Sequence, residues 1–196
     1  LQAVLDFFLL AGDDIYDDLI GASVVRLYER LNHWLKSNWK FQARKNISYH
    51  YDLGNQFYRE WLDKTMTYSS ALFKNKKEVL SSAQTNKYES ICKNLNLKEG
   101  DSILEIGCGW GGFAEHAIKT RGVKLTGLTL SKEQLDYSKK RMFELGMADN
   151  SSFLLQDYRD EKGVYDGVVS IEMFEAVGEK YWPIYFKTVK NLSTLF

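Results

Sequence analysis

Three glycines in one short segment could bring a nucleoside cofactor close to the main chain. Gly107, Gly109 and Gly111 are spaced G-x-G-x-G and follow an apolar run, 102–106, that predicts a buried strand. Glycine has no Cβ, so a tight turn here lets a ligand approach the backbone closely. The spacing differs slightly from the dinucleotide pattern G-x-G-x-x-G, so the turn alone does not identify the cofactor.

Hydroxyl and amide side chains follow the next predicted strand. Dehydrogenases often carry an acid at the end of the second strand, where it binds the ribose hydroxyls. Thr129 stands at this position, and its hydroxyl can also form a hydrogen bond with ribose. Ser131 and Gln134 follow at the spacing of a capping box. These two residues therefore have either a ligand-binding role or only a structural one.

Alternating strands and helices would place these residues at one edge of a parallel sheet. From the apolar patterns we expect strands at 102–106, 123–128, 152–155 and 165–171, and helices at 55–62, 78–96, 111–121, 131–145 and 181–191, with a loop over 67–73. Strands separated by helices of this length are typical of a doubly wound α/β domain. Four strands are fewer than such a domain needs, so we expect more chain beyond Phe196.

Composition excludes several classes of protein. The 26 basic and 26 acidic residues give zero net charge, which argues against nucleic acid as the main partner. No apolar run approaches the roughly 20 residues of a membrane-spanning helix. Cys92 and Cys108 are expected to be reduced and cytosolic. The three histidines show no metal-ligand spacing with the cysteines, so we expect no metal site.

Local charge near the N-terminus is uneven. We expect a helical segment over residues 1–45, and its second half combines Trp34, Trp39 and Phe41 with several basic residues. A basic helix with aromatic side chains can lie on a membrane surface. The alternative is a helix that packs on the main domain and exposes a charged face to solvent. The first residue is leucine, so the sequence is expected to be part of a longer protein.

Five sequence blocks together resemble the cyclopropane fatty acid synthase family. They are YHYDLGNQFY at 49–58, MTYSSALF at 66–73, EIGCGWGG at 105–112, GLTLSKEQ at 127–134 and FEAVG at 174–178. The resemblance extends from about residue 46 to residue 190 in the family's order. Many methyltransferases share the glycine turn, whereas the first and fourth blocks are specific to this family.

The resemblance implies a fold and a cofactor. The family consists of S-adenosylmethionine-dependent enzymes with the class I methyltransferase fold, a Rossmann-like α/β domain. On this basis the chain would divide into an N-terminal helical segment (1–45), a helical cap over the active site (46–97) and a cofactor-binding domain (98–196) that is incomplete at its C-terminus.

The resemblance also implies cofactor-binding residues. Tyr68 and Ser69 would contact the methionine end of S-adenosylmethionine, and the glycine turn would pass beneath it. The ribose and adenine would face Thr129, Leu130 and Gln134. Asp157 and Tyr158 would flank the adenine, the first as a hydrogen-bond acceptor and the second by stacking.

In this family, a glutamate at the position of Glu175 lines the reaction centre and helps to hold a bicarbonate ion that acts as the base. Glu172 is a competing candidate for this role, but the family match favours Glu175. Ser70 stands where many members have cysteine, and Ala176 where many have histidine. Ser70 can still form a hydrogen bond with an anion, and Tyr68 lies beside it, so Glu175, Ser70 and Tyr68 are the predicted catalytic residues.

The implied reaction adds the methyl carbon of the cofactor, as a methylene bridge, to a cis double bond of an unsaturated phospholipid acyl chain. The alternatives are C-methylation or methylenation of the same bond, a small-molecule methyltransferase, or a binding module without activity. We expect a cytoplasmic protein that is peripheral at the inner face of the membrane. The protein could also form a homodimer.

Overall fold

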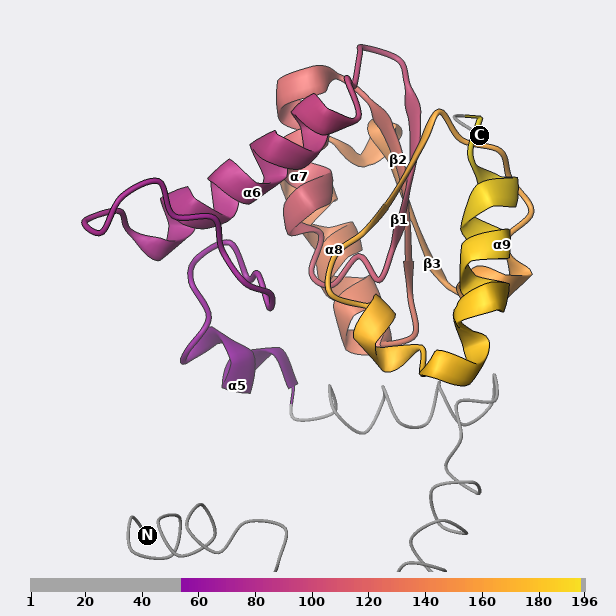
Figure 1. Cartoon of the computed structure of the whole chain (residues 1–196). Helices are drawn as coiled ribbons and strands as arrows, with labels where there is room; N and C mark the ends of the chain where they lie inside the picture. The colour runs from indigo at the N-terminus through magenta and orange to yellow at the C-terminus, as the bar shows by residue number, and fades with distance from the viewer. Residues whose placement is uncertain (1–53, 195–196) are drawn as a thin grey trace, which may run out of the picture. The chain divides into compact units, whose positions relative to one another are not determined.

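A parallel sheet forms the centre of the computed structural model, which describes residues 54–194 (Figure 1). Within these residues the sheet has four strands in the order β3-β2-β1-β4. The strands are β1 (Ser102–Ile106), β2 (Lys124–Thr129), β3 (Ser151–Leu155) and β4 (Gly167–Ser170). The expected helical segment 1–45 and its basic aromatic half lie outside the described residues.

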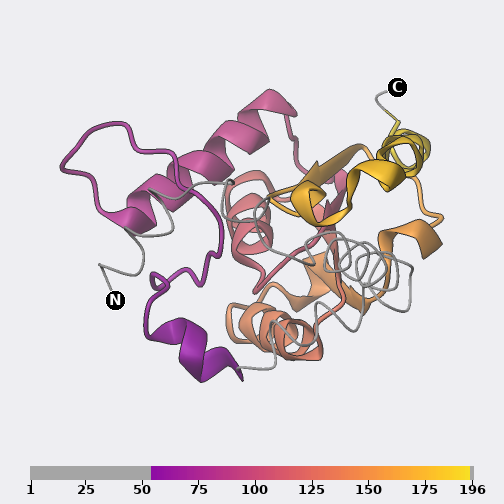
Figure 2. The same ribbon diagram turned by 60° about the horizontal axis from the view of Figure 1, so that its bottom comes forward.

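Both faces of the sheet are covered by helices (Figures 1 and 2). The helices are α5 (Gly54–Arg59), α6 (Leu80–Asn94), α7 (Gly112–Arg121), α8 (Lys132–Glu144) and α9 (Trp182–Leu192). Alternate side chains of a strand point to opposite faces. Ile103 accordingly joins a core with α6, α7 and α8, whereas Leu104 and Ile106 join a second core with α9. The predicted α/β class is therefore confirmed, with helices on each face of a parallel sheet.

The register brings the carboxyl ends of the strands level with one another. Ile106 pairs with Leu128 on one side and with Ser170 on the other. The segments that leave these strands therefore start at the same edge, which is where open α/β sheets bind ligands. Within the described part of the chain, four short 3-10 helices lie on the connections, at Ala148–Asn150, Tyr158–Asp160, Phe174–Ala176 and Glu179–Tyr181.

Several elements are shorter than the sequence predicts. The helix expected over 78–96 is observed as α6 over Leu80–Asn94, and the helix expected over 131–145 as α8 over Lys132–Glu144. The strand expected over 165–171 is ordered as β4 only over Gly167–Ser170, because Tyr165 forms a bridge with Ser193 instead of extending the ladder. The helix expected over 55–62 ends at Arg59, and the chain then turns. In the described part of the chain, no helix has the length and apolar character needed to cross a membrane.

Candidate functional site

The turn after β1 leaves space for a ligand at the main chain. Its glycines all have positive φ, at 80° for Gly107, 52° for Gly109 and 77° for Gly111. The amides of Gly107 and Cys108 both donate to the carbonyl of Leu128, 2.9 Å away, which fixes the turn on β2. A Cβ on Gly109 would meet no atom within 4 Å, so the main chain borders open space there. A Cβ on Gly107 would lie 3.0 Å from Met173, so this position is closely packed.

A buried carboxyl group lies just before this turn. Glu105, the fourth residue of β1, is only 3% exposed, and among the described residues its Oε2 has no hydrogen-bond partner. Burial raises the pKa of Glu105 well above its usual value, although the charges of Arg141 and Lys87 act in the opposite direction. A buried carboxyl with an unused oxygen is suited to bind a cationic or N–H group.

Glu105 is a candidate site residue that was not predicted from the sequence. The signal that could have identified it is an acidic residue inside the otherwise apolar run 102–106. A buried acid in a strand needs a partner, and the partner here is absent among the described residues.

A segment that we call the strap, residues 63–70, is fastened to one side of α6. Gln84 donates through Nε2 to the carbonyl of Ser69 at 2.8 Å, and the Lys87 ammonium donates to the Ser69 hydroxyl at 2.5 Å. The Tyr88 hydroxyl lies 2.7 Å from that of Thr67. Residues at this spacing share one face of a helix, so a single face of α6 binds most of the strap.

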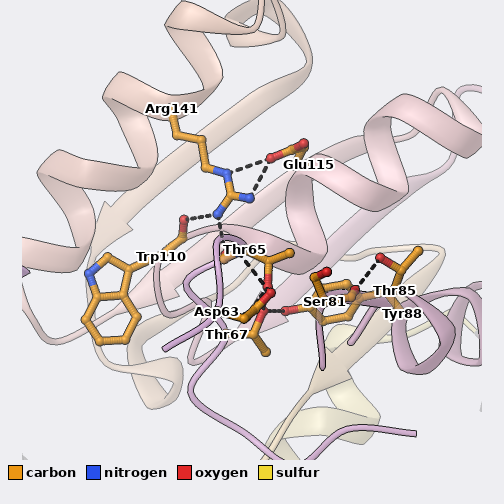
Figure 3. Close-up of polar contacts among 9 residues, drawn as sticks. All are labelled: Asp63, Thr65, Thr67, Ser81, Thr85, Tyr88, Trp110, Glu115 and Arg141. Carbon is orange, nitrogen blue, oxygen red and sulfur yellow. Dashed lines mark hydrogen bonds and ion pairs between the residues drawn. The ribbon is translucent and has the colours of Figure 1, made fainter. Parts of the chain in front are cut away.

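Arg141 of α8 joins the strap to the glycine turn (Figure 3). Its guanidinium forms an ion pair with Glu115 of α7, with Nη2 2.6 Å from Oε2. The same group donates through Nη1 to the carbonyls of Thr65 at 2.9 Å and Trp110 at 3.2 Å. One side chain thus connects α7, α8, the strap and the turn after β1.

Aromatic rings lie beside the strap. Trp110 is buried, and its indole N–H donates to Asn55 Oδ1 at 2.6 Å. Tyr58 packs on it with ring centroids 4.8 Å apart, and Tyr68 packs on Tyr58 at 5.7 Å and on Trp61 at 5.2 Å. Tyr68 is 54% exposed, so part of its ring faces solvent, and its contact with the methionine end of the cofactor stays a prediction.

The structure brings Ser70 to Glu172. The Ser70 amide donates to Oε1 of Glu172 at 2.8 Å, and the Ser70 hydroxyl donates to the same oxygen. Glu172 follows β4 with a φ of 48°, an unusual value for a residue other than glycine. The Lys87 ammonium group donates to the Ser70 carbonyl at 2.7 Å. Ser70 is therefore flanked by the carboxylate of Glu172 and the ammonium group of Lys87. Glu175 is exposed in the next 3-10 helix, where its charge adds to the effect of burial in raising the pKa of Tyr185.

Thr129, Ser131 and Gln134 form a buried polar turn after β2. The Thr129 hydroxyl donates to Oε1 of Gln134 at 2.9 Å and accepts from the Ser131 amide at 3.1 Å. Ser131 is the N-cap of α8, and its Oγ accepts from the main-chain N–H of Gln134 at 3.3 Å. The structural role of Ser131 is therefore observed, while Leu130 lies half-buried between the two hydroxyl residues. The predicted contacts with ribose and adenine stay predictions.

Asp157 and Tyr158 follow β3, but both have partners within the chain. Asp157 forms an ion pair with Arg159, whose Nη2 lies 2.6 Å from Oδ2. The Tyr158 ring packs on Tyr185 of α9, with centroids 5.4 Å apart. Stacking on an adenine would therefore have to use the part of the Tyr158 ring that Tyr185 leaves exposed. This role of Tyr158 stays a prediction.

The histidine, cysteine and acidic side chains are possible metal ligands, and the two cysteines are also possible nucleophiles. Among residues 54–194, no three histidine, cysteine or acidic side chains are placed to hold a metal ion. Cys92 and Cys108 are free and buried, and burial raises the pKa of the Cys92 thiol to about 11. Neither thiol is therefore an activated nucleophile at neutral pH.

Comparison with known proteins gives consistent results. The sequence profile described as mycolic acid cyclopropane synthetase matches residues 38–194. A probable fatty acid methyltransferase of Pseudomonas putida is 44% identical over 152 residues, which are 76% of this chain and 39% of that protein. The cyclopropane-fatty-acyl-phospholipid synthase of Escherichia coli K12 is 43% identical over 144 residues, covering 73% of this chain and 36% of that protein.

A solved structure agrees with these matches. The crystal structure of the mycolic acid cyclopropane synthase CmaA1, complexed with SAH and CTAB, has a TM-score of 0.75 and 32% identity. The alignment covers 78% of this chain and 53% of that one. The chain spans less than half the length of the two curated relatives, at 39% and 36%.

Loss of the Arg141 guanidinium should release the strap. We expect Arg141→Met to lower the free energy of unfolding by about 2–4 kcal/mol, because it leaves Glu115 and two carbonyls without their donor. Lys140→Met is the matched control on the same helix, because that lysine only pairs with Glu144 at 3.7 Å on the surface; we expect about 0.5 kcal/mol or less. Urea unfolding measures both, and equal losses would contradict the role of Arg141.

The buried acid should make stability depend on pH. The pKa of Glu105 is raised in the folded state, so its favourable contribution is complete below the unfolded pKa and is lost as pH rises towards the folded pKa. We therefore expect Glu105→Gln to unfold at higher urea concentration than the wild type at pH 8, with a smaller difference at pH 4.5. Glu60→Gln, an exposed control, should show no such trend. Parallel pH profiles for wild type and Glu105→Gln would contradict this.

Proposed function

The chain belongs to the mycolic acid cyclopropane synthetase family, and from this membership we propose that it is part of an enzyme that transfers a one-carbon unit from S-adenosylmethionine to lipid acyl chains. Two observations at the end of β1 carry the proposal: the open space over Gly109, and the buried Oε2 of Glu105 that has no hydrogen-bond partner among the described residues. The profile match covers both of these residues, together with the strap.

The residues at this edge fit the proposed cofactor. The amino acid end of S-adenosylmethionine carries an ammonium group, and Glu105 offers a buried carboxyl oxygen that has no hydrogen-bond partner among the described residues. Burial raises the pKa of Glu105, and a bound ammonium group would oppose this effect, as the charges of Arg141 and Lys87 already do in part. The exposed face of Tyr68 suits a sulfonium cation nearby. Thr129 ends β2 and Asp157 follows β3 at the same edge of the sheet, where a nucleoside would extend. When bound, the cofactor supplies an activated methyl group.

The proposed acceptor is an acyl chain. The two curated relatives are named for fatty acids and for fatty-acyl phospholipids, which supports this class of substrate. We propose further that the acceptor is a cis double bond of a phospholipid chain and that the product is a cyclopropane. We also propose that the enzyme is cytoplasmic and peripheral at the inner face of the membrane. We propose a homodimer as its oligomeric state, and the mass of the full-length protein in solution tests this.

A second candidate product is a methyl- or methylene-branched chain. Methyl transfer to the double bond leaves a carbocation on the neighbouring chain carbon. Loss of a proton from the new methyl group with closure of a C–C bond gives a ring, whereas loss of a proton from an adjacent chain carbon gives a methyl-branched alkene. A hydride shift towards the cation, followed by loss of a proton from the methyl group, gives a methylene branch. The Ser70 hydroxyl, which the resemblance assigns to holding a bicarbonate base, already donates to the carboxylate of Glu172. This contact uses the donor that would hold the external base, so it is the observation that makes a different route of proton loss, and hence the second product, worth testing.

The decisive experiment supplies methyl-labelled S-adenosylmethionine to the full-length protein with vesicles of cis-unsaturated phospholipid. We expect label in the acyl chains, and NMR and mass spectrometry would identify its chemical form. A labelled ring supports the first product, and a labelled branch supports the second. Cofactor binding without any labelled lipid would contradict the proposed function.

The two glutamates after β4 should behave differently. If Glu175 lines the reaction centre, Glu175→Gln should lower kcat about 100-fold or more while cofactor affinity stays the same. Glu172→Gln keeps the shape of the side chain but weakens its contacts with Ser70, so we expect about a tenfold loss and a changed ratio of ring to branch. Glu179→Gln, an exposed neighbour, is the control. Full activity of both variants would contradict the assignment.

A further inference from the structure

The loop between the strap and α6 combines exposed apolar side chains with lysines. Its large apolar residues are Leu72, Phe73, Val79 and Leu80, and these are 48%, 52%, 64% and 42% exposed. Lys74, Lys76 and Lys77 lie between them and are also exposed. In Figures 1 and 2 this segment, residues 71–79 together with Leu80 at the start of α6, extends away from the sheet. We call it the apolar-basic loop.

The apolar-basic loop has an ordered backbone. The Leu72 amide donates to the carbonyl of Ala83 at 3.1 Å, and Asn86 donates to the carbonyl of Leu72 at 3.2 Å. Glu78, the only acid of the loop sequence, accepts from the Lys74 amide and from the Asn86 side chain, both at 2.7 Å. The negative charge is therefore used inside the loop, and the lysine ammonium groups are left on its surface.

These observations indicate a particular kind of partner. Aqueous solvent does not favour four half-exposed apolar side chains on a fixed loop, whereas the boundary between lipid headgroups and acyl chains does. Lysines beside such residues are attracted to anionic headgroups, and their aliphatic stems can also lie in the interface. The chain has no net charge, so this attraction must come from local clusters such as this one.

We propose that the apolar-basic loop docks on an anionic phospholipid bilayer, with Leu72 and Phe73 inserted among the headgroups and Lys74, Lys76 and Lys77 on the anionic surface. This inference rests on the proposed function and deepens it, because it names the surface from which the acyl chain is taken. Ser70 precedes the loop directly and contacts Glu172. Docking would therefore hold the proposed reaction centre close to the membrane surface.

The test measures sedimentation of the full-length protein with vesicles of phosphatidylcholine alone or with phosphatidylglycerol added. We expect stronger binding to the anionic vesicles and weaker binding as salt rises. A triple lysine-to-glutamate variant at 74, 76 and 77 should bind anionic vesicles at least about tenfold more weakly. Leu72→Ser with Phe73→Ser should lose about tenfold on both kinds of vesicle.

Matched controls carry the same changes elsewhere on the described surface. Lys98, Lys119 and Lys124 are exposed near the opposite edge of the sheet, and their change to glutamate alters net charge equally. Phe143 and Leu145 at the end of α8 are 76% and 45% exposed, and changing both to serine removes an equivalent pair of apolar side chains. Both control variants should bind vesicles like the wild type. Equal losses in the control and loop variants would overturn the proposal.

Two other outcomes would also overturn it. If the serine variant binds vesicles normally but unfolds at lower temperature, another part of the protein covers the loop. If it binds normally but changes the mass in solution, a second copy covers it. Vesicle binding is measured without cofactor and without turnover, so its result is independent of the labelling experiment. A protein that binds vesicles through the loop but labels no lipid would refute the proposed function alone.

Discussion

The contact between the Arg141 guanidinium and its three partners determines how the proposed site is assembled. The side chain comes from α8, its charge is balanced by Glu115 of α7, and its remaining donors bind carbonyls of the strap and the glycine turn. Carbonyl oxygens of loops are costly to bury without a donor, and a guanidinium offers several donors in a fixed plane. The two irregular segments that border the site are therefore held by one group on a regular element.

The strap gains further order from the packing around it. Thr65, Thr67 and Tyr88 form a chain of hydroxyl contacts, each 2.7 Å long, that leads from the strap to α6. A Cβ on Gly112 would lie 2.6 Å from the Tyr88 hydroxyl, so the first residue of α7 has to be small for this chain to form. The glycine block thus serves two purposes, since Gly109 borders open space whereas Gly112 allows the strap to approach.

The sequence predicted the regular elements well and the irregular contacts poorly. Apolar runs and the glycine spacing identified the four strands and their order in the chain, because these depend on local pattern. The Arg141 contacts join residues 76 and 31 positions apart through backbone carbonyls, which no side-chain pattern encodes. The meeting of Ser70 and Glu172, 102 positions apart, depends likewise on the path of the chain after β4. Glu105 was visible as an acid in an apolar strand, but its burial required the two neighbouring strands and α6.

The order of segments along the chain suggests how cofactor and lipid would be coordinated. The strap lies next to the proposed cofactor space, Ser70 at its end contacts an acid, and the apolar-basic loop follows at once. Gln84, Lys87 and Tyr88 fix the strap on α6, while Ala83 and Asn86 of the same helix hold the start of the loop. One helix, α6, therefore holds both the strap and the start of the apolar-basic loop. A displacement of the loop can reach the strap through the few hydrogen bonds that each forms with α6. Because several hydrogen bonds hold both the main chain and the side chains of the strap on this helix, the lipid would be brought to a preformed site, without a large opening of the strap.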